Sequence, residues 1–268
     1  MLRLALITAL MTAALLLGGS AAHADGFDSQ INLELAFRET ILDVTAPNRY
    51  RSLIRDGETT ITFVSDFPGS VAKTDFFLNL DWSYDYRYAI QTTEGITEVS
   101  VTPLNVKLMP RLRHVIRMPV ALYREEVWES RLLGHEFDHV AVSLDPRPRA
   151  LLVHLCSELP TSRFSMDGQE KPSDKQMREG INHEIQRRQS AILDLLRANY
   201  VALDKVSQNG RSAMQDRKDF FESLYTQQNL EATEFPFRKE VVSLLESESY
   251  RQLRPRHVPA DPVTLPPR

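Results

Sequence analysis

The sequence predicts an α+β protein in which an antiparallel sheet is followed by a helical second half. Residues 25–110 repeat hydrophobic side chains with a period of two and are rich in β-branched and aromatic types, as strands are. From residue 111 the hydrophobic spacing changes to three and four residues, which is the period of an amphipathic helix. With 42% hydrophobic residues in 268, the chain can bury a substantial core.

The overall charge excludes one class of partner. The chain has 32 Lys and Arg against 36 Asp and Glu, a net charge of -4, so no basic nucleic-acid binder is predicted. Its only cysteine is Cys156, so an intramolecular disulfide is impossible.

Residues 1–24 have the pattern of a secretory signal peptide. Arg3 is followed by an apolar run from Leu4 to Leu17, and Ala22-His23-Ala24 has the small-x-small pattern of a cleavage site. A membrane anchor is the alternative, but the run is shorter than the roughly 20 residues that a span needs. We expect a mature chain from Asp25 that is periplasmic or secreted, with no membrane span after cleavage.

Two segments carry the strand prediction. Thr59–Val64 is a β-branched run after the turn pair Asp56-Gly57. Between residues 82 and 90, aromatic or aliphatic side chains alternate strictly with Ser, Asp, Arg and Ala, so we expect this aromatic stripe to lie in the core rather than to bind a ligand. Further strands are expected at Ile96–Val101 and Val106–Leu108.

The helical half is predicted from a stripe at Trp128, Leu132, His135, His139 and Val142, spaced 4, 3, 4 and 3. Asp145-Pro146 should end this helix. The other expected elements of residues 111–250 are helices at 150–159, 176–207, 220–225 and 241–245, with a loop at 161–175. The proline-rich tail, residues 251–268, is expected to be disordered.

One motif in the first of these helices carries chemistry. His135-Glu136-Phe137-Asp138-His139 is an H-E-x-x-H sequence, in which two histidines four residues apart share a helix face and can bind one Zn²⁺. Zinc makes water a nucleophile near neutral pH, and Glu136 would act as its general base and return the proton to the leaving amine. The competing interpretation is a solvated helix with incidental histidines. Asp138 must face water or have a partner.

The order of motifs resembles a bacterial family of secreted zinc-dependent proteases of unknown substrate. The resemblance covers residues 31–210 and depends on Asp81-Trp82-Ser83-Tyr84, Val99-Ser100-Val101, Pro110, Trp128 and Gly134–His139. The family also has a downstream signature, Tyr-Asp-x-x-Thr-x-His-Gly. Here Asp204 and Gly210 match it, Ser207 replaces threonine, Leu203 replaces tyrosine and Asn209 replaces histidine. The resemblance implies a zincin-like metallopeptidase, without a known substrate.

A catalytic zinc needs a third protein ligand, for which Asp204 is the first choice. Tyr200 lies one turn before it and would stabilise an oxyanion. Asp204 can instead have a capping or ion-pairing role. The competing ligands are His154, Glu158 and Glu184, the last together with its neighbour His183. Glu184 is also four residues from Arg188 and suited to a helix ion pair.

Three functions are compatible with these residues. The first is a periplasmic zinc metallopeptidase that acts on a peptide or protein. The second is a non-catalytic binding or scaffold protein that keeps a degenerate zincin fold, an alternative based on Asp138 and Asn209. The third is a metal amidase acting on cell-wall peptides. Cys156 has no basic surroundings that would make it a nucleophile. The arginines at 147, 149, 187 and 188 are expected at the surface.

Overall fold

The computed structural model describes residues 46–64, 72–122, 127–167 and 171–256. The expected signal peptide and most of the proline-rich tail lie outside the described residues. No helix within these ranges has the length and apolar character needed to cross a membrane.

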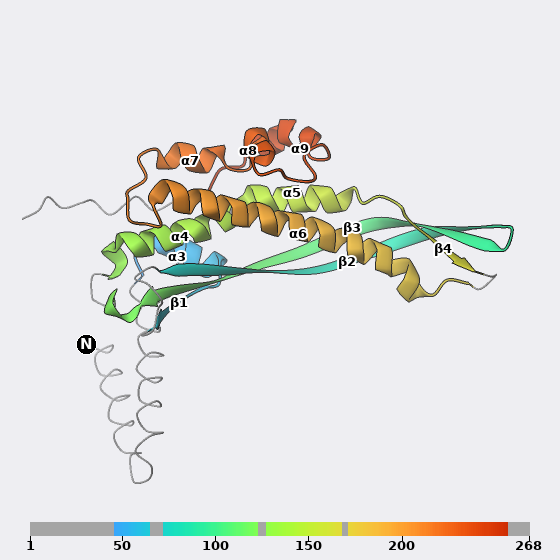
Figure 1. Cartoon of the computed structure of the whole chain (residues 1–268), viewed down its shortest axis with the longest axis horizontal. Helices are drawn as coiled ribbons and strands as arrows, with labels where there is room; N and C mark the ends of the chain where they lie inside the picture. The colour runs from blue at the N-terminus through green and yellow to red at the C-terminus, as the bar shows by residue number, and fades with distance from the viewer. Residues whose placement is uncertain (1–45, 65–71, 123–126, 168–170, 257–268) are drawn as a thin grey trace, which may run out of the picture. The chain divides into compact units, whose positions relative to one another are not determined.

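The described strands form a four-stranded mixed sheet, so the chain is α+β as predicted (Figure 1). Its strands are β1 (Thr59–Val64), β2 (Lys73–Thr93), β3 (Ile96–Pro119) and β4 (Ser162–Asp167). The prediction of a purely antiparallel sheet was wrong. β2 and β4 pair with β3 in antiparallel fashion, whereas β1 is parallel to β3. The physical reason is that β3 lies between β1 and β2, so two strands that follow each other in sequence do not pair.

The β2–β3 hairpin is longer than the sequence suggested. β3 runs through the gap between the two strands expected at 96–101 and 106–108. The sequence suggested a break because the pairing of the hairpin shifts its register between Ser83 and Asp85 of β2. On β3 the shift lies near Asn105, whose φ is +52°. A bulge interrupts the hydrophobic alternation without ending the strand.

The aromatic stripe of β2 is a half-buried face rather than part of the core, which corrects the prediction. Its members bond to α6 (Asp174–Ser207): Trp82 Nε1 and Tyr84 Oη both donate to Asn182 Oδ1, at 3.0 and 2.9 Å. Farther along the hairpin, Tyr88 and Ile90 are 41% and 44% exposed. The distal hairpin extends past the start of α6, so the helix covers only part of the stripe (Figure 1).

Three helices pack on the sheet and carry the residues of interest: α4 (Arg131–Ser143), α5 (Pro146–Ser157) and α6. Trp128 precedes α4, in the short 3-10 helix Val127–Glu129, because Ser130 caps α4. α4 ends at Ser143, just before Asp145-Pro146 as predicted, and Asp145 then caps α5, accepting a hydrogen bond from the Arg147 amide at 2.9 Å. The expected loop at 161–175 contains β4 instead.

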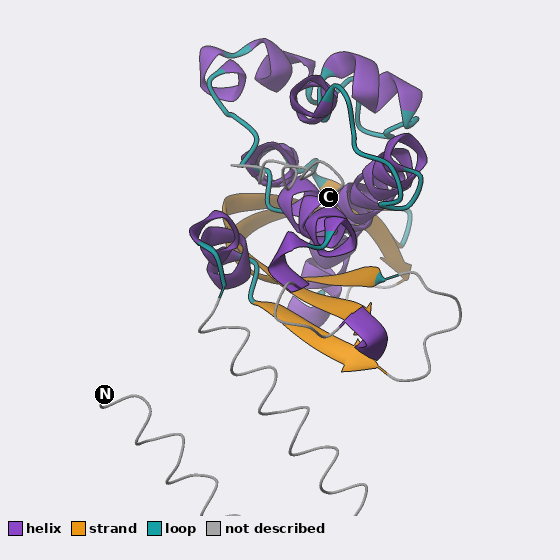
Figure 2. Ribbon diagram, turned by 90° about the vertical axis from the view of Figure 1, so that its left-hand side faces the viewer, coloured by secondary structure: helices purple, strands orange, loops and turns teal. Residues whose placement is uncertain are grey.

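The chain begins its described part with α3 (Asn48–Asp56), inside the half expected to be β-rich. It ends with short helices on the outer side of α5 and α6 (Figure 2), namely α7 (Arg217–Ser223), α8 (Gln227–Ala232), α9 (Val242–Glu246) and α10 (Glu248–Arg251).

Two arginines expected at the surface are buried, which corrects the prediction. Arg147 is 6% exposed, pairs with Asp145 at 2.6 Å and donates to the Phe221 carbonyl at 2.7 Å. Arg188 is 2% exposed, pairs with Glu184 as the i,i+4 spacing indicated, and donates to the Leu155 carbonyl at 2.9 Å. Each buried charge is satisfied by a carboxylate and carbonyls, which offsets its desolvation.

Candidate metal centre

Helices α4 and α6 bring together the three predicted metal ligands. His135 Nε2 and His139 Nε2 lie 3.2 Å apart on α4, as expected for residues one helical turn apart. Asp204, on the last turn of α6, places Oδ1 3.0 Å from the first nitrogen and 3.1 Å from the second. The group can therefore hold a metal ion.

The spacing of these atoms fits zinc. Tetrahedral zinc with bonds of about 2.0–2.1 Å places its ligand atoms about 3.3 Å apart. The separations of 3.0–3.2 Å come close to that value. Both histidine side chains are almost fully buried, while the side chain of Asp204 is 38% exposed, so the group is most open on the side of α6.

The charges within the group are strongly coupled. Burial alone would raise the pKa of Asp204, but hydrogen bonds from His135 and His139 hold it well below the usual range. Burial alone would lower the pKa of His135, yet the hydrogen bond to Asp204 and the nearby carboxylates raise it. The aspartate is therefore an anion at neutral pH, the form that binds a metal ion.

Ser207 sets the orientation of His135. Its hydroxyl donates to the Leu203 carbonyl at 2.8 Å, so toward His135 Nδ1, at 3.2 Å, it can act only as an acceptor. Nδ1 of His135 then carries a proton, and in the metal-free protein Nε2 carries a second one, which it donates to Asp204. A metal ion would replace this second proton and bind the lone pair of Nε2. Outer partners of this kind fix the tautomer of metal-binding histidines.

Gly210 packs directly against the same imidazole. A Cβ atom at this position would lie 2.9 Å from the His135 ring, and its φ of +74° also favours glycine. Thus all three positions at which the downstream signature matches or nearly matches, Asp204, Ser207 and Gly210, contact His135. Of the two departures, Leu203 is fully buried and Asn209 is exposed.

We predict that Ser207→Ala lowers zinc affinity about tenfold, because His135 loses the acceptor that fixes its ring. Ser207→Thr, which restores the hydroxyl, should recover the affinity. Competition titration with a zinc chelator measures both. An alanine variant with parental affinity would show that the serine only caps the helix.

Glu136 is held by a residue that the sequence did not single out. The glutamate is 2% exposed, and Thr74 Oγ1, on β2, donates to Glu136 Oε2 at 2.7 Å. Burial raises the pKa of Glu136, although both histidines and Thr74 act against this shift. No motif marks Thr74, because its role arises only when β2 packs on α4.

Asp138 has the partner that its place in the motif required. It is 5% exposed and forms an ion pair with Arg217 at the start of α7. The charge is therefore compensated from outside the helix, and it does not exclude a metal-binding helix.

The Tyr200 ring lies against His139, with centroids 4.4 Å apart. Its hydroxyl donates to Ser143 Oγ at 3.2 Å, and burial raises the pKa of the phenol. The oxyanion role of Tyr200 stays a prediction.

Ser143 also joins a buried histidine that the sequence analysis missed. His114, on β3, is fully buried, with Nδ1 2.8 Å from the Gly57 carbonyl and Nε2 2.6 Å from Ser143 Oγ. The carbonyl only accepts, so Nδ1 carries the proton and the serine donates to Nε2. Burial lowers the pKa of His114 to about 4, which keeps the ring neutral.

This neutral histidine predicts a loss of stability in acid. Between pH 6.5 and about 4 the unfolded chain binds a proton at His114 that the folded protein does not, so the free energy of unfolding falls as pH falls. The slope from this residue is about 1.4 kcal/mol per pH unit. Urea titrations of metal-free parent and His114→Gln should show a shallower acid loss in the variant; equal slopes would contradict the assignment.

The competing ligands lie elsewhere. His154 Nε2 is 3.1 Å from the Glu240 carbonyl, Glu158 is 4.0 Å from His154 Nδ1, and Glu184 pairs with Arg187 and Arg188. Burial raises the pKa of Cys156 to about 11, so its thiol is a poor nucleophile.

No protein-family model matches the chain, and neither curated proteins nor solved structures show a significant similarity to it.

Proposed function

We propose that this protein is a periplasmic or secreted zinc metallopeptidase that hydrolyses an amide bond in a peptide or protein. One observation carries the proposal. The two histidines of H-E-x-x-H and Asp204, 65 residues later, present three ligand atoms within 3.2 Å of one another, beside a buried glutamate. A helix with incidental histidines would not be expected to meet a carboxylate in this way.

Each residue has a distinct role in the proposed reaction. His135, His139 and Asp204 hold the metal ion. Zinc bound there would supply a Lewis acid that makes water nucleophilic near neutral pH. Glu136 takes the proton of the attacking water and delivers it to the leaving amine.

The resemblance to secreted zinc-dependent proteases supports the same proposal. The signature positions with matching or similar residues here, Asp204, Ser207 and Gly210, are those that contact the first histidine. A signature that served only to end α6 would require no contact with α4.

A second candidate function is that of a non-catalytic binding or scaffold protein. It is favoured by the burial of the site, since His135, Glu136 and His139 are 6%, 2% and 5% exposed. The Glu136 carboxylate also already accepts a hydrogen bond from Thr74. In this alternative the metal ion stabilises the contact between α4 and α6 and no peptide is cleaved.

Metal analysis of the purified protein tests the site. We expect one equivalent of zinc per chain, and none in His135→Ala at unchanged helical content. A peptide library with mass-spectrometric readout then separates the two functions. Cleavage that disappears when zinc is removed supports the peptidase, whereas stoichiometric zinc without cleavage supports the scaffold. A parent that binds no zinc would overturn both.

A further inference from the structure

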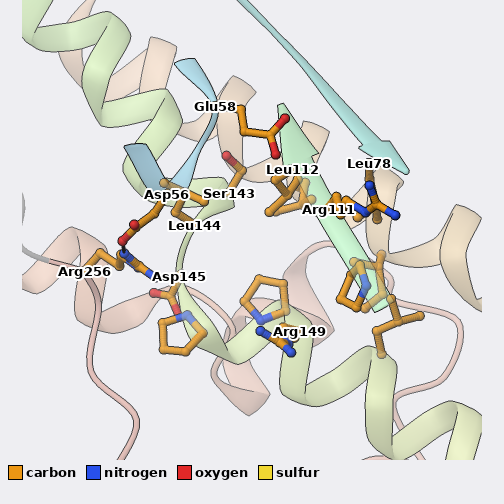
Figure 3. A pocket seen from close by; sticks show the side chains of 16 residues that line it. Asp56, Glu58, Leu78, Arg111, Leu112, Ser143, Leu144, Asp145, Arg149 and Arg256 are labelled. Atoms are coloured by element: carbon orange, nitrogen blue, oxygen red, sulfur yellow. Dashed lines mark hydrogen bonds and ion pairs between the residues drawn. The ribbon is translucent and has the colours of Figure 1, made fainter. Parts of the chain in front are cut away.

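A cavity of about 300 Å³ lies between β3 and the start of α5 (Figure 3). Its lining includes five aliphatic side chains, which together are called the apolar wall below: Leu78, Leu112, Leu152, Ile192 and Leu196. The volume is at the lower end of the range for small-molecule sites, which are mostly apolar with a few placed polar groups. None of the three metal-binding residues lines it.

Most charged groups around this cavity are already paired. Arg256 pairs with Asp56, Arg111 with Asp81 at 2.8 Å, and Asp145 with Arg147 at 2.6 Å. These charges are compensated without a ligand.

Two lining charges differ from the rest. Glu58, between α3 and β1, and Arg149, on α5, form no ion pair and no side-chain hydrogen bond with any described residue. Their charges are opposite, and they lie on different sides of the cavity, with Leu112 between them in the view of Figure 3. The cavity thus has an exposed anion and an exposed cation, each without a partner among the described residues, beside an apolar wall.

We propose that this cavity binds a small apolar zwitterion of the size of a dipeptide. Glu58 would accept hydrogen bonds from the ammonium group, and the Arg149 guanidinium would bind the carboxylate. The apolar wall would contact the apolar side chains. A fatty-acid anion fits less well, because it offers no cation to Glu58.

The cavity is separate from the metal group but shares a helix with it. Ser143, which lines the cavity, lies one turn after His139 on α4. A dipeptide could also bind to zinc at the proposed active site, so the binding experiments use Asp204→Ala alongside the parent. Binding that persists in Asp204→Ala belongs to the cavity, and the proposal does not depend on peptidase activity.

The test measures binding of Leu-Leu by ligand-observed NMR, with three comparison ligands. N-acetyl-Leu-Leu lacks the ammonium group, Leu-Leu-amide lacks the carboxylate, and octanoate has only a carboxylate and an apolar chain. We expect Leu-Leu to bind both proteins and each comparison ligand to bind fivefold or more weakly. Octanoate binding more tightly than Leu-Leu would overturn the proposal in favour of a fatty-acid site, and absence of Leu-Leu binding would overturn it outright.

Variants of Glu58 and Arg149 test which end of the dipeptide each residue binds. Glu58→Gln should weaken the binding of Leu-Leu fivefold or more. This variant should then bind Leu-Leu and N-acetyl-Leu-Leu with similar affinity. Arg149→Gln should also weaken the binding of Leu-Leu fivefold or more, and should then bind Leu-Leu and Leu-Leu-amide with similar affinity. The control variants are Glu98→Gln, near the start of β3, and Arg163→Gln, on β4. They make the same changes of charge and should leave the binding of Leu-Leu unchanged. If the control variants weaken binding equally, the effect is one of net charge and the proposed site is wrong.

Discussion

Glu136→Gln is expected to lower zinc-dependent peptide hydrolysis about 10³-fold while the protein keeps its fold and its zinc. Glutamine has nearly the shape of glutamate and can still bond to Thr74 Oγ1, so the helix should not change. What is lost is the group that accepts the proton from water and returns it to the amine, a contribution of about 10² to 10⁴ in rate. The loss should appear in kcat with little change in KM.

Glu129→Gln is the matched control. Glu129 is also a glutamate next to α4, but its side chain is 62% exposed and pairs with Arg49 at the surface. Its removal should leave turnover within about twofold. Zinc content and circular dichroism are measured for both variants. Near-parental turnover in Glu136→Gln would mean that the glutamate is structural and that the chemistry lies elsewhere.

Local periodicity accounts for the part of the fold that could be predicted. The change from a period of two to a period of 3.6 marks the change from hairpin to helices, and the long helix was placed within two residues of its start. Periodicity carries no information on strand partners, because β1 pairs with β3 across 55 residues. The parallel pairing and the existence of β4 therefore could not be read from it.

Buried charge was missed for a related reason. Arg147 and Arg188 look like surface residues in sequence, where arginine next to proline or in a polar helix is usually solvated. Their burial depends on the Phe221 and Leu155 carbonyls, which are 74 and 33 residues away. Only the assembled helical layers supply these acceptors.

The candidate site also has residues that the sequence predicts and supporting residues that it does not. His135 and His139 follow from helical spacing alone, and Asp204 was chosen because the downstream signature retains it. The groups that hold the side chains of the motif come from other elements: Thr74 on β2 bonds to Glu136, and Ser207 at the end of α6 bonds to His135. Ser207 could have been suspected as a near match to the signature, whereas nothing in the sequence marks Thr74.

The largest effect on metal binding is expected for Asp204→Ala. The variant would leave two histidines as protein ligands, and zinc bound by two ligands instead of three should be held at least 10²-fold more weakly. The structure gives this expectation a geometric basis, because Asp204 Oδ1 lies within 3.1 Å of both imidazole nitrogens. Isothermal titration with zinc, or chelator competition where binding is tight, measures the loss.

The three competing ligands supply the comparison. His154→Ala and Glu158→Ala should keep parental affinity, since among the described residues their side chains bond only to each other and to the Glu240 carbonyl. Glu184→Ala should also bind zinc normally but unfold more readily, because it leaves the buried Arg188 without its closest carboxylate. Urea titration of each variant separates loss of metal from loss of fold.

Asp194→Ala is the control within the same helix. Asp194 lies on α6, is 66% exposed and, within the part of the chain that the structure describes, pairs only with Arg197. Its removal changes the charge of the helix without touching the metal group. If Asp204→Ala and Asp194→Ala weaken zinc binding equally, the effect is electrostatic and Asp204 is not a ligand. If Asp204→Ala retains zinc while His154→Ala or Glu158→Ala loses it, the third ligand lies on α5. In that case H-E-x-x-H would still mark a metal site, but the signature around Asp204 would have no part in it.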